Sequence, residues 1–367
     1  MFRAARTLVF LRESRELVGF NYFTRQTFAC SADLIAFLDQ LQDWATFDEI
    51  CASNPLFDPD ELQQQVQALL DVSALVARDS RPHREEALYE ENWTWGVPTI
   101  LFHQTVQDRP YLSLAEATDI QKARLEERPA PSLSMSAGIQ SDDVIDLEHA
   151  SDDALLSLMA KRRTVRESDG AAISLEQITD CLYAGLGITG SVTNDAGITL
   201  PLGMTPSGGA RNPFEAYVCA REIDGLASGF FHYSAKDHAL TRIRTNQAPS
   251  LASLAGDQEW ADDLPCMIIL VGFLDRPMWK YHDANAYRVT LIEAGHIGQN
   301  IMLAATQHGL SACPTAALNH SLISECLELE SGLFQTPIYG LALSRPAPES
   351  AVMATSFYQA GVAEFAN

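Results

Sequence analysis

The spacing of apolar residues predicts a small domain at the start of the chain. Residues 7–12 and 16–24 alternate between apolar and polar positions on either side of a polar turn, as half-buried strands do. Signals for three short helices follow, and then a returning strand at 74–77. This order predicts a winged-helix-like domain over residues 1–100.

Local start signals mark the three helices. Ser31 stands before the first, and Thr46 with Glu49 has the spacing of a capping box before the second. Asp58 and Glu61 repeat that spacing before the third. Because a capping side chain satisfies the first N–H groups of a helix, we expect the helices to begin directly after these residues.

A second, larger domain is predicted from residue 151 onward. Ser151 and Ser174 are expected to cap helices, the latter in a capping box with Gln177. The unbroken apolar run at 265–273 is typical of a central strand buried on both faces. Residues 291–305 are apolar nearly all round, which predicts a helix at the domain centre or in a subunit interface. Further strands are expected at 217–219, 229–233, 240–243 and 338–343.

The segment between the two domains is rich in turn-forming residues. Residues 126–146 contain two prolines, several serines and several acids, which predicts a linker or a surface loop. The expected organisation is a winged-helix-like domain at 1–100, a linker or extension at 101–150 and a second domain at 151–367.

The charge composition argues against nucleic acid as the main partner. The 367 residues carry 48 Asp and Glu against 25 Lys and Arg, a net charge of −23, whereas phosphate backbones require clustered cations. The first hundred residues hold 8 Arg, no Lys and 16 acids, so their net charge is −8. We expect the first domain to recognise a peptide by strand addition at a sheet edge, or to have a structural or dimerisation role.

The cysteines and apolar runs bear on location. Seven scattered cysteines form no Cys-x-x-Cys pair, which argues against a disulfide framework or a structural zinc site. Reduced cysteines, and the lack of an apolar run of about 18 residues, predict a cytoplasmic protein with no membrane partner.

Two polar clusters carry the candidate chemistry. Residues 161–166, Lys-Arg-Arg-Thr-Val-Arg, place four cations within six residues of an acidic chain. They are either a helix end that favours cations, or a phosphate clamp in which arginine forks and the Thr164 hydroxyl bind the oxygens.

The second cluster, 206–215, has the sequence Pro-Ser-Gly-Gly-Ala-Arg-Asn-Pro-Phe-Glu. Gly208 and Gly209 let the backbone approach a ligand closely. Ser207 and Arg211 offer donors to an anion or to the edge of a planar ring. A structural turn before a strand is the alternative interpretation.

Four features, taken in order, resemble the nitroreductase superfamily. They are Arg-Arg-Thr-Val-Arg after a helix, Pro-Ser-Gly-Gly-Ala before a strand, Tyr-Arg…Glu-Ala-Gly-His…Gln-Asn in an apolar helix, and a late Gly-Leu…Cys-Pro. More narrowly, residues 152–346 are similar to the SagB-type branch, which includes the azoline oxidases of ribosomal peptide maturation. The chain departs from that branch at Thr164, where serine is usual, and at Arg211-Asn212, where Leu-His is common.

This resemblance implies an α+β, nitroreductase-like FMN-binding fold with a central, mostly antiparallel sheet flanked by helices, and FMN at a homodimer interface. It implies a catalytic role for Lys280 and Tyr281, a pair similar to one in azoline oxidases. The implied FMN contacts are Arg162, Arg163, Thr164 and Arg166 at the phosphate and ribityl chain, Pro206, Ser207, Gly208, Gly209 and Arg211 along the flavin, Pro314, Thr315 and Ala316 near the isoalloxazine, and Arg345 at the phosphate.

The leading hypothesis is an FMN-dependent dehydrogenase that matures a ribosomally synthesised peptide, by oxidising an azoline to an azole or by desaturating a residue. Lys280 or Tyr281 would take a proton while the flavin accepts a hydride. One alternative is an NAD(P)H-dependent nitroreductase or quinone reductase, and another is a non-catalytic peptide-binding scaffold subunit. The expected partners are a precursor peptide, a second copy of the chain, and a cyclase or other maturation enzymes.

Overall fold

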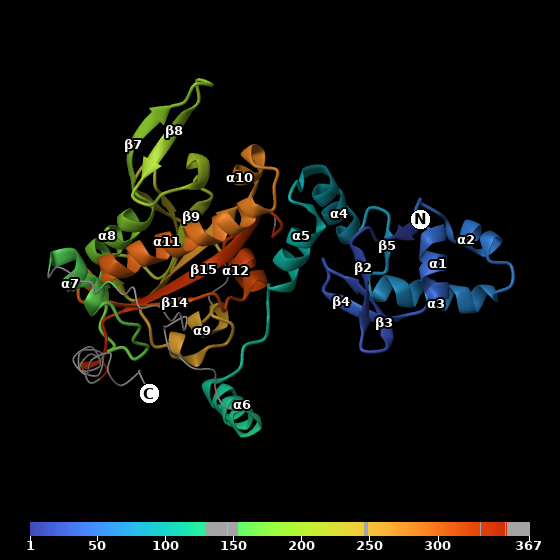
Figure 1. Ribbon diagram of the computed structural model, residues 1–367, viewed down its shortest axis with the longest axis horizontal. Helices are drawn as coiled ribbons and strands as arrows, with labels where there is room; N and C mark the ends of the chain where they lie inside the picture. Colours follow the sequence, from blue (N-terminus) through green and yellow to red (C-terminus); the bar gives the residue numbers. More distant parts are fainter. Residues whose placement is uncertain (129–144, 146–152, 246–248, 331, 349, 351–367) are drawn as a thin grey trace. The chain divides into compact units, whose positions relative to one another are not determined.

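The chain folds into two compact units in the computed structural model, which describes residues 1–128, 145, 153–245, 249–330, 332–348 and 350 (Figure 1). The first unit contains Met1–Gln107 together with Lys280–Tyr287. The second contains Asp108–Trp279 and Arg288–Asn367. A short segment from the C-terminal half of the chain therefore groups with the N-terminal residues.

Part of the predicted linker is helical. α5 (Gly96–Thr105) and α6 (Leu114–Glu127) lie within or across residues 101–128, and α6 begins with a complete capping box at Ser113. Residues 129–144 and 146–152, including the predicted cap Ser151, lie outside the described residues. The helix that follows, α7 (Ala154–Lys161), has Asp153 as its N-cap.

The first unit combines two small antiparallel sheets with helices. One sheet pairs β1 with β5, and the other has the order β2–β3–β4. The predicted strand at 16–24 is shorter than expected, because Arg25 has a positive φ of 59° and turns the chain into β4, which we did not predict. The elements are β1 (Phe2–Ala4), β2 (Leu8–Glu13), β3 (Glu16–Asn21), β4 (Gln26–Cys30), α1 (Ala32–Gln40), α2 (Phe47–Ser53), α3 (Pro59–Asp71), β5 (Leu75–Ala77) and α4 (Arg81–Asn92).

The helices of this unit begin where the capping signals predict. The Ser31 hydroxyl accepts from the Leu34 N–H, and Thr46 forms a complete capping box with Glu49. Asp58 accepts from two N–H groups at the start of α3. The apolar sides of the three helices share one core cluster with β5, which includes Leu38, Ile50, Leu62, Val66 and Leu75.

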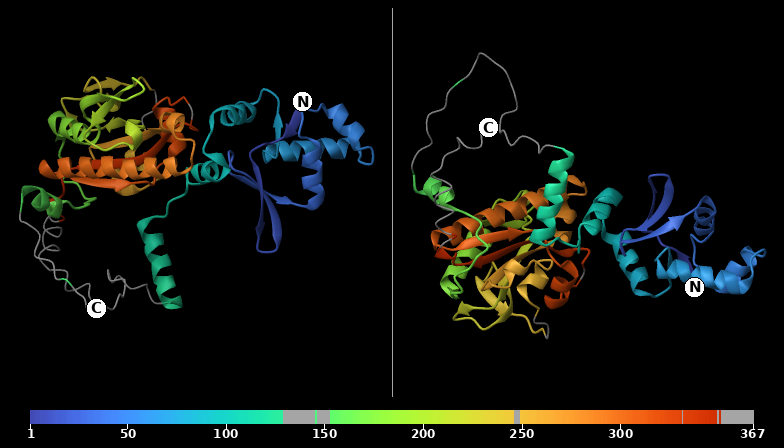
Figure 2. Two further views of the ribbon diagram at one scale, coloured as in Figure 1. Left: turned by 45° about the horizontal axis from the view of Figure 1, so that its top comes forward. Right: turned by 90° about the horizontal axis from the view of Figure 1, so that it is seen from below.

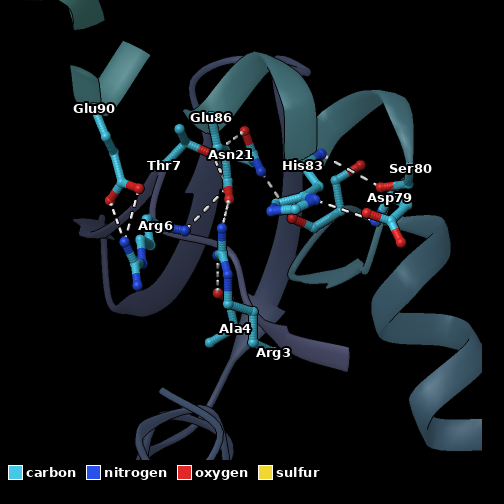
Figure 3. A network of polar contacts seen from close by, with 11 residues as sticks. Arg3, Ala4, Arg6, Thr7, Asn21, Asp79, Ser80, His83, Glu86 and Glu90 are labelled. Atoms are coloured by element: carbon cyan, nitrogen blue, oxygen red, sulfur yellow. Dashed lines mark hydrogen bonds and ion pairs between the residues drawn. The ribbon is translucent and has the colours of Figure 1, made fainter. Parts of the chain in front are cut away.

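A buried ion pair joins α4 to β1 (Figure 3). Arg3 Nη2 lies 2.7 Å from Glu86 Oε2, and both side chains are at most 3% exposed. Glu86 Oε1 also accepts hydrogen bonds from the Arg6 N–H and from the Thr7 hydroxyl, each at 3.0 Å. One carboxylate therefore pairs with a guanidinium and accepts from a main-chain donor and a hydroxyl in the interior of the unit.

The second unit is an α+β domain built on a six-stranded sheet with the order β12–β11–β9–β13–β15–β14. Every neighbouring pair in this sheet is antiparallel. The five strands predicted from the sequence are confirmed, and β14 is an addition. The strands are β9 (Phe214–Ala220), β11 (Gly229–Ser234), β12 (Ala239–Arg242), β13 (Cys266–Phe273), β14 (Ser311–Thr315) and β15 (Gln335–Ser344).

Helices cover both faces of this sheet. α8 (Leu175–Leu186) and α11 (Asn285–Gln307) contribute to the core on one face, and α9 (Leu251–Leu254) and α12 (His320–Cys326) to the core on the other. β13 alternates between the two cores, because Ile268 belongs to the first and Met267 to the second. Figure 2 shows α11 running along its face of the sheet. The strand predicted at 265–273 is therefore confirmed as β13, a central strand buried on both faces.

α11 is longer than the predicted helix and is buried on one side only. Ala294, Ile297 and Ile301 belong to the core cluster, whereas Ile292 and His296 are exposed. The nearly continuous apolar sequence therefore does not bury the helix all round within one chain.

A hairpin of β7 (Ile188–Thr193) and β8 (Thr199–Gly203) projects from the second unit (Figure 1). Its strands are largely exposed, so no buried face gave a sequence signal for it. The remaining elements are the parallel pair β6 (Ile173–Ser174) and β10 (Ile223–Asp224), the 3₁₀ turns at Gly208–Ala210 and Glu259–Ala261, and α10 (Asp275–Lys280). Across the described ranges, none of the helices combines the length and apolarity needed to cross a bilayer.

We predict that removing the buried carboxylate destabilises the first unit strongly. Glu86→Ala leaves Arg3 as an uncompensated buried charge, which typically costs about 3–5 kcal/mol. Arg81→Ala, which breaks the exposed Arg81–Glu85 pair, is the control and should cost less than about 1 kcal/mol. Urea unfolding followed by tryptophan fluorescence measures both variants. Equal unfolding free energies would contradict the prediction.

Candidate functional site

The arginine segment at 161–166 is fixed to β14. The Val165 N–H donates to Ser311 Oγ at 2.9 Å, and the Ser311 hydroxyl lies 3.1 Å from the Val165 carbonyl oxygen. Cys313 Sγ approaches the same carbonyl at 2.8 Å. The structure therefore brings the predicted phosphate segment to the strand that also carries Pro314 and Thr315.

Exposure alternates along this segment. Val165 is buried, whereas Thr164 and Arg166 are exposed on either side of it. Arg166 Cζ lies 5.5 Å from the centre of the Trp260 ring. Burial raises the pKa of the Cys313 thiol to about 11, although the charge of Arg166 acts in the opposite direction. Cys313 is therefore a packing residue, since a nucleophilic cysteine needs its thiolate form.

Two further predicted phosphate ligands, Arg163 and Arg345, have protein partners. Arg163 Nη1 donates to the carbonyl oxygens of Ala160 and Arg162, at 2.9 and 2.7 Å. Arg345 Nε forms an ion pair with Asp169, whose own N–H donates to the Arg345 carbonyl oxygen at 3.1 Å. Arg345 thus lies beside the chain that follows the arginine segment, with part of its guanidinium already paired.

The end of β14 is held by polar contacts within the second unit. Thr315 is buried, and its Oγ1 accepts from the Ala317 N–H at 3.0 Å. The Tyr111 hydroxyl donates to the Ala316 carbonyl oxygen at 3.2 Å. These contacts fix the main chain of the predicted isoalloxazine segment.

Residues 206–212, here called the glycine loop, contain three residues with positive φ. Gly209 has φ 63°, Ala210 52° and Asn212 44°. Positive φ in residues other than glycine is uncommon and persists only where surrounding contacts enforce it. One such contact is local, because the Asn212 N–H donates to Ser207 Oγ at 2.8 Å.

α11 anchors the first half of the glycine loop through Glu293. This carboxyl is 5% exposed and accepts from the Gly208 N–H at 3.2 Å. Burial raises the pKa of Glu293, and the hydrogen bonds from Ser207 and Gly208 offset only part of that effect. A Cβ on Gly208 would lie 2.9 Å from Val289 Cγ1, so this loop approaches α11 as closely as only glycine permits.

α10 holds the second half of the loop. Arg211 Nε donates to the Arg276 carbonyl oxygen at 3.0 Å, and Arg211 Cζ lies 4.7 Å from the centre of the Trp279 ring. Arg276 Nη1 in turn donates to the Asn212 carbonyl oxygen at 3.0 Å. Arg211, predicted to line the flavin, therefore has its side chain packed against this short helix.

Behind the loop, Arg276 and His232 share the carboxylate of Glu215. His232 Nε2 lies 2.6 Å from Glu215 Oε2, and Arg276 Nη2 bonds to the other carboxylate oxygen. Burial would raise the pKa of Glu215, but the hydrogen bonds from His232 and Arg276 outweigh it and lower the pKa. These three residues and Glu293 line a cavity of about 260 Å³.

Lys280 and Tyr281, the predicted catalytic pair, group with the first unit. Lys280 Nζ lies 5.3 Å from the centre of the Tyr281 ring. The indole N–H of buried Trp95 donates to the Tyr281 carbonyl oxygen at 2.8 Å. Further along the segment, the Tyr287 hydroxyl lies 3.1 Å from His103 Nδ1. The first unit therefore fixes the backbone of this segment, and its catalytic role stays a prediction.

Four residues of this cavity were not predicted from the sequence, namely Glu215, His232, Arg276 and Glu293. Glu293 could have been found, because it is an acid within a nearly continuous apolar helix. A buried acid almost always has a partner, so its position predicts a polar contact. The other three carried no such signal, because they lie on separate elements that only the folded sheet brings together. Among the residues that the structure describes, no group of three His, Cys, Asp or Glu side chains is arranged to hold a metal ion.

The model of the nitroreductase family matches residues 159–343, half of the chain. The chain therefore belongs to the nitroreductase family, and the predicted α+β fold with its antiparallel sheet is confirmed.

Relatives of known name fall into two groups. The putative nitroreductase MJ1384 of Methanocaldococcus jannaschii is 30% identical over 177 residues, which are 48% of this chain and 85% of that protein. The trifolitoxin-processing protein TfxB of Rhizobium leguminosarum bv. trifolii is 34% identical over 34% of this chain and 35% of its own. The microcin B17-processing protein McbC of Escherichia coli is 29% identical over 34% of this chain and 48% of its own. The chain thus spans less than half of either processing protein.

One similar solved structure is the Escherichia coli microcin synthetase McbBCD complex with truncated pro-MccB17 bound. The similarity covers 65% of this chain and 84% of the matched chain, at 23% identity and a TM-score of 0.48.

We predict that Glu293 makes stability depend on pH. Its pKa is raised in the folded state, so its stabilising contribution is complete below the unfolded-state pKa and is lost as the pH rises through the folded-state value. Glu293→Gln keeps an acceptor for the Gly208 N–H and cannot ionise. The Tm of the variant relative to wild type should therefore increase between pH 4 and pH 7. Exposed Glu222→Gln is the control, and a Tm difference that does not change with pH would refute the prediction.

Proposed function

We propose that the chain is an FMN-dependent dehydrogenase that acts in the maturation of a ribosomally synthesised peptide. The reaction would oxidise an azoline to an azole or desaturate a residue. The observation that carries the proposal is a nitroreductase-family domain in which exposed Thr164 and Arg166 lie on a segment fixed to β14, together with a tightly held glycine loop. The similarity to two proteins named for processing peptide toxins supports the peptide substrate.

The residues of the arginine segment fit the phosphate of FMN. A dianionic phosphate needs cations and hydroxyl donors, and this acidic chain concentrates them at 161–166. Thr164 and Arg166 point away from the packed side of the segment, which Val165 occupies. We assign the phosphate to Arg162, Arg163, Thr164 and Arg166, with Arg345 nearby.

The glycine loop fits a planar ring. Gly208 and Gly209 are half-buried and carry no side chains that would block a ring, and Pro206, Ser207 and Arg211 complete the edge of the loop. Pro314, Thr315 and Ala316 would form a second contact. Bound FMN would supply the hydride acceptor for the oxidation. The protein would orient the substrate and take up the proton that leaves it.

Lys280 and Tyr281 are the proposed proton-handling groups. The two side chains lie against each other, and both are accessible. The Trp95 hydrogen bond fixes the Tyr281 main chain, which restricts where both side chains can reach. A positioned acid or base of this kind typically contributes about 10²–10⁴-fold to a rate.

The first unit is proposed to bind the leader of the precursor peptide. In its three-stranded sheet, β2 and β4 each pair only with β3 among the described residues. Each strand therefore has an edge to which an extended peptide can add by main-chain hydrogen bonds. Phe10 and Leu11 on β2 are exposed and offer apolar contacts to such a peptide.

A second copy of the chain and other maturation enzymes are the proposed partners. Apolar residues on α7 and on one side of α11 are exposed among the residues that the structure describes, and such patches mark interfaces. They are Leu155, Leu156, Met159, Val289 and Ile292. A homodimer would bury them. A cyclase that forms the azoline would supply the substrate, and the chemistry would take place in the cytoplasm.

We predict that the purified protein contains about one FMN per chain, which an absorption spectrum and identification of the released cofactor will test. A colourless protein that takes up no added FMN would refute the dehydrogenase proposal and favour a non-catalytic peptide-binding scaffold.

Arg166→Gln should weaken FMN binding by about 10–100-fold, the effect of one charge-assisted hydrogen bond. Exposed Arg244→Gln is the control and should bind FMN like wild type.

The likeness to a putative nitroreductase along most of that protein's length makes a general reductase the second candidate. The same preparation distinguishes the two. Rapid bleaching of the flavin by NAD(P)H, with turnover of small nitroaromatics or quinones, would favour the reductase.

We predict that Lys280→Ala lowers kcat for oxidation of a thiazoline peptide by about 10²–10⁴-fold while FMN stays bound. Lys122→Ala, on the exposed side of α6, is the matched control. If Lys280→Ala keeps kcat within a few-fold of wild type, Lys280 is not the acid or base.

A further inference from the structure

Arg276 is the junction between the glycine loop, α10 and the central sheet. Its Nη1 donates to the Asn212 carbonyl oxygen, and its own carbonyl oxygen accepts from Arg211 Nε, each at 3.0 Å. Its Cζ lies 4.4 Å from the centre of the Phe273 ring, at the end of β13. One residue therefore contacts both of the last two residues of the loop and the strand that precedes α10.

Glu215 fixes the guanidinium of Arg276 from the sheet. Glu215 lies on β9, the strand that the glycine loop enters, and its carboxylate bonds to Arg276 through one oxygen and to His232 of β11 through the other. About a quarter of the Glu215 side chain is exposed, and about a third of the other two. A carboxylate used on both oxygens has little freedom to rotate, so it sets the orientation of the arginine fork.

From this geometry we infer that Glu215 and His232, acting through Arg276, are positioning residues for the proposed flavin site. They hold the glycine loop in its positive-φ conformation and fix it to the first turn of α10. The inference rests on the proposed function, because it assigns a purpose to the loop. None of the three residues is proposed to touch the reacting atoms.

The conformation of the glycine loop requires contacts that hold it in place. Ala210 and Asn212 have positive φ, a conformation that residues other than glycine keep only when neighbouring contacts enforce it. Glu293 holds the first half of the loop through Gly208. The Asn212 carbonyl, at the other end, bonds to Arg276. Loss of the Arg276 fork would therefore release the second half of the loop while the first half stays anchored.

Replacement of Arg276 by lysine tests the inference, because lysine keeps the positive charge and lacks the planar set of guanidinium donors. Arg276→Lys cannot reach the Asn212 carbonyl and Glu215 with the paired geometry of a guanidinium. Glu215→Gln is the second variant, in case the first folds poorly. The control is Arg221→Lys, since Arg221 also bonds to a carbonyl oxygen and a carboxylate, both of Asp262, at a distant and exposed site.

Two measurements on the intact protein test whether the Arg276 contacts hold the glycine loop. Amide hydrogen exchange of a peptide covering 206–214 should be about 10–100-fold faster in Arg276→Lys and Glu215→Gln, the loss expected for one charge-assisted hydrogen bond. With a thiazoline peptide, kcat should fall by at least about 10-fold, with KM within about threefold of wild type and FMN content unchanged. Arg221→Lys should match wild type in both measurements.

The inference is overturned if exchange and kcat are unchanged in both variants, or if activity falls only in proportion to lost FMN or lost folded protein. The exchange measurement needs no turnover. A wild-type protein without flavin would therefore refute the proposed function, and the exchange result would still decide whether the Arg276 contacts hold the loop.

Discussion

The second unit depends on the burial of β13 between two other strands and two helical layers. Seven of its eight residues are buried, and it pairs along its length with β9 and β15. A strand buried on both faces has no access to water, so both of its neighbours must supply hydrogen bonds to its main chain. Fully burying each large apolar side chain contributes about 1.5–3 kcal/mol. The position of β13 therefore determines where its neighbours begin and end.

The candidate site follows from this pairing. In the register of β9 and β13, Phe214 lies opposite Gly272, and the Phe273 N–H donates to the Pro213 carbonyl oxygen. The glycine loop enters β9 where β13 leaves the sheet toward α10. Asn212 and Arg276 meet for this reason, although neither has a local sequence signal for the other. The same sheet presents Glu215 and His232 as cross-strand neighbours behind them.

The acidic composition of the chain gives its few cations distinct environments. Arg3 and Arg276 are paired with carboxylates and have structural contacts on several elements. Arg166 is exposed beside a buried valine on a segment with several cations. Four cations within six residues of a chain of net charge −23 form a local concentration of positive charge that attracts anions. This contrast is the physical basis for the proposal that the arginine segment binds an anionic group.

The sequence by itself determined the features that depend on neighbouring residues. The capping boxes at Thr46 and Ser174 form as predicted, because a cap joins residues only three positions apart. The apolar run of β13 identified a central strand, because a strand buried on both faces needs apolar side chains on both. The ordered motifs were sufficient to indicate the nitroreductase family.

Tertiary structure alone decided the contacts between distant segments. Val165 and Ser311 are 146 positions apart, Gly208 and Glu293 are 85 apart, and Glu215 and Arg276 are 61 apart. Each pair joins elements whose register and packing are set by the sheet, and no periodicity along the chain encodes that register. The exposed side of α11 is a second case, because its apolar sequence specifies burial without specifying which surface provides it.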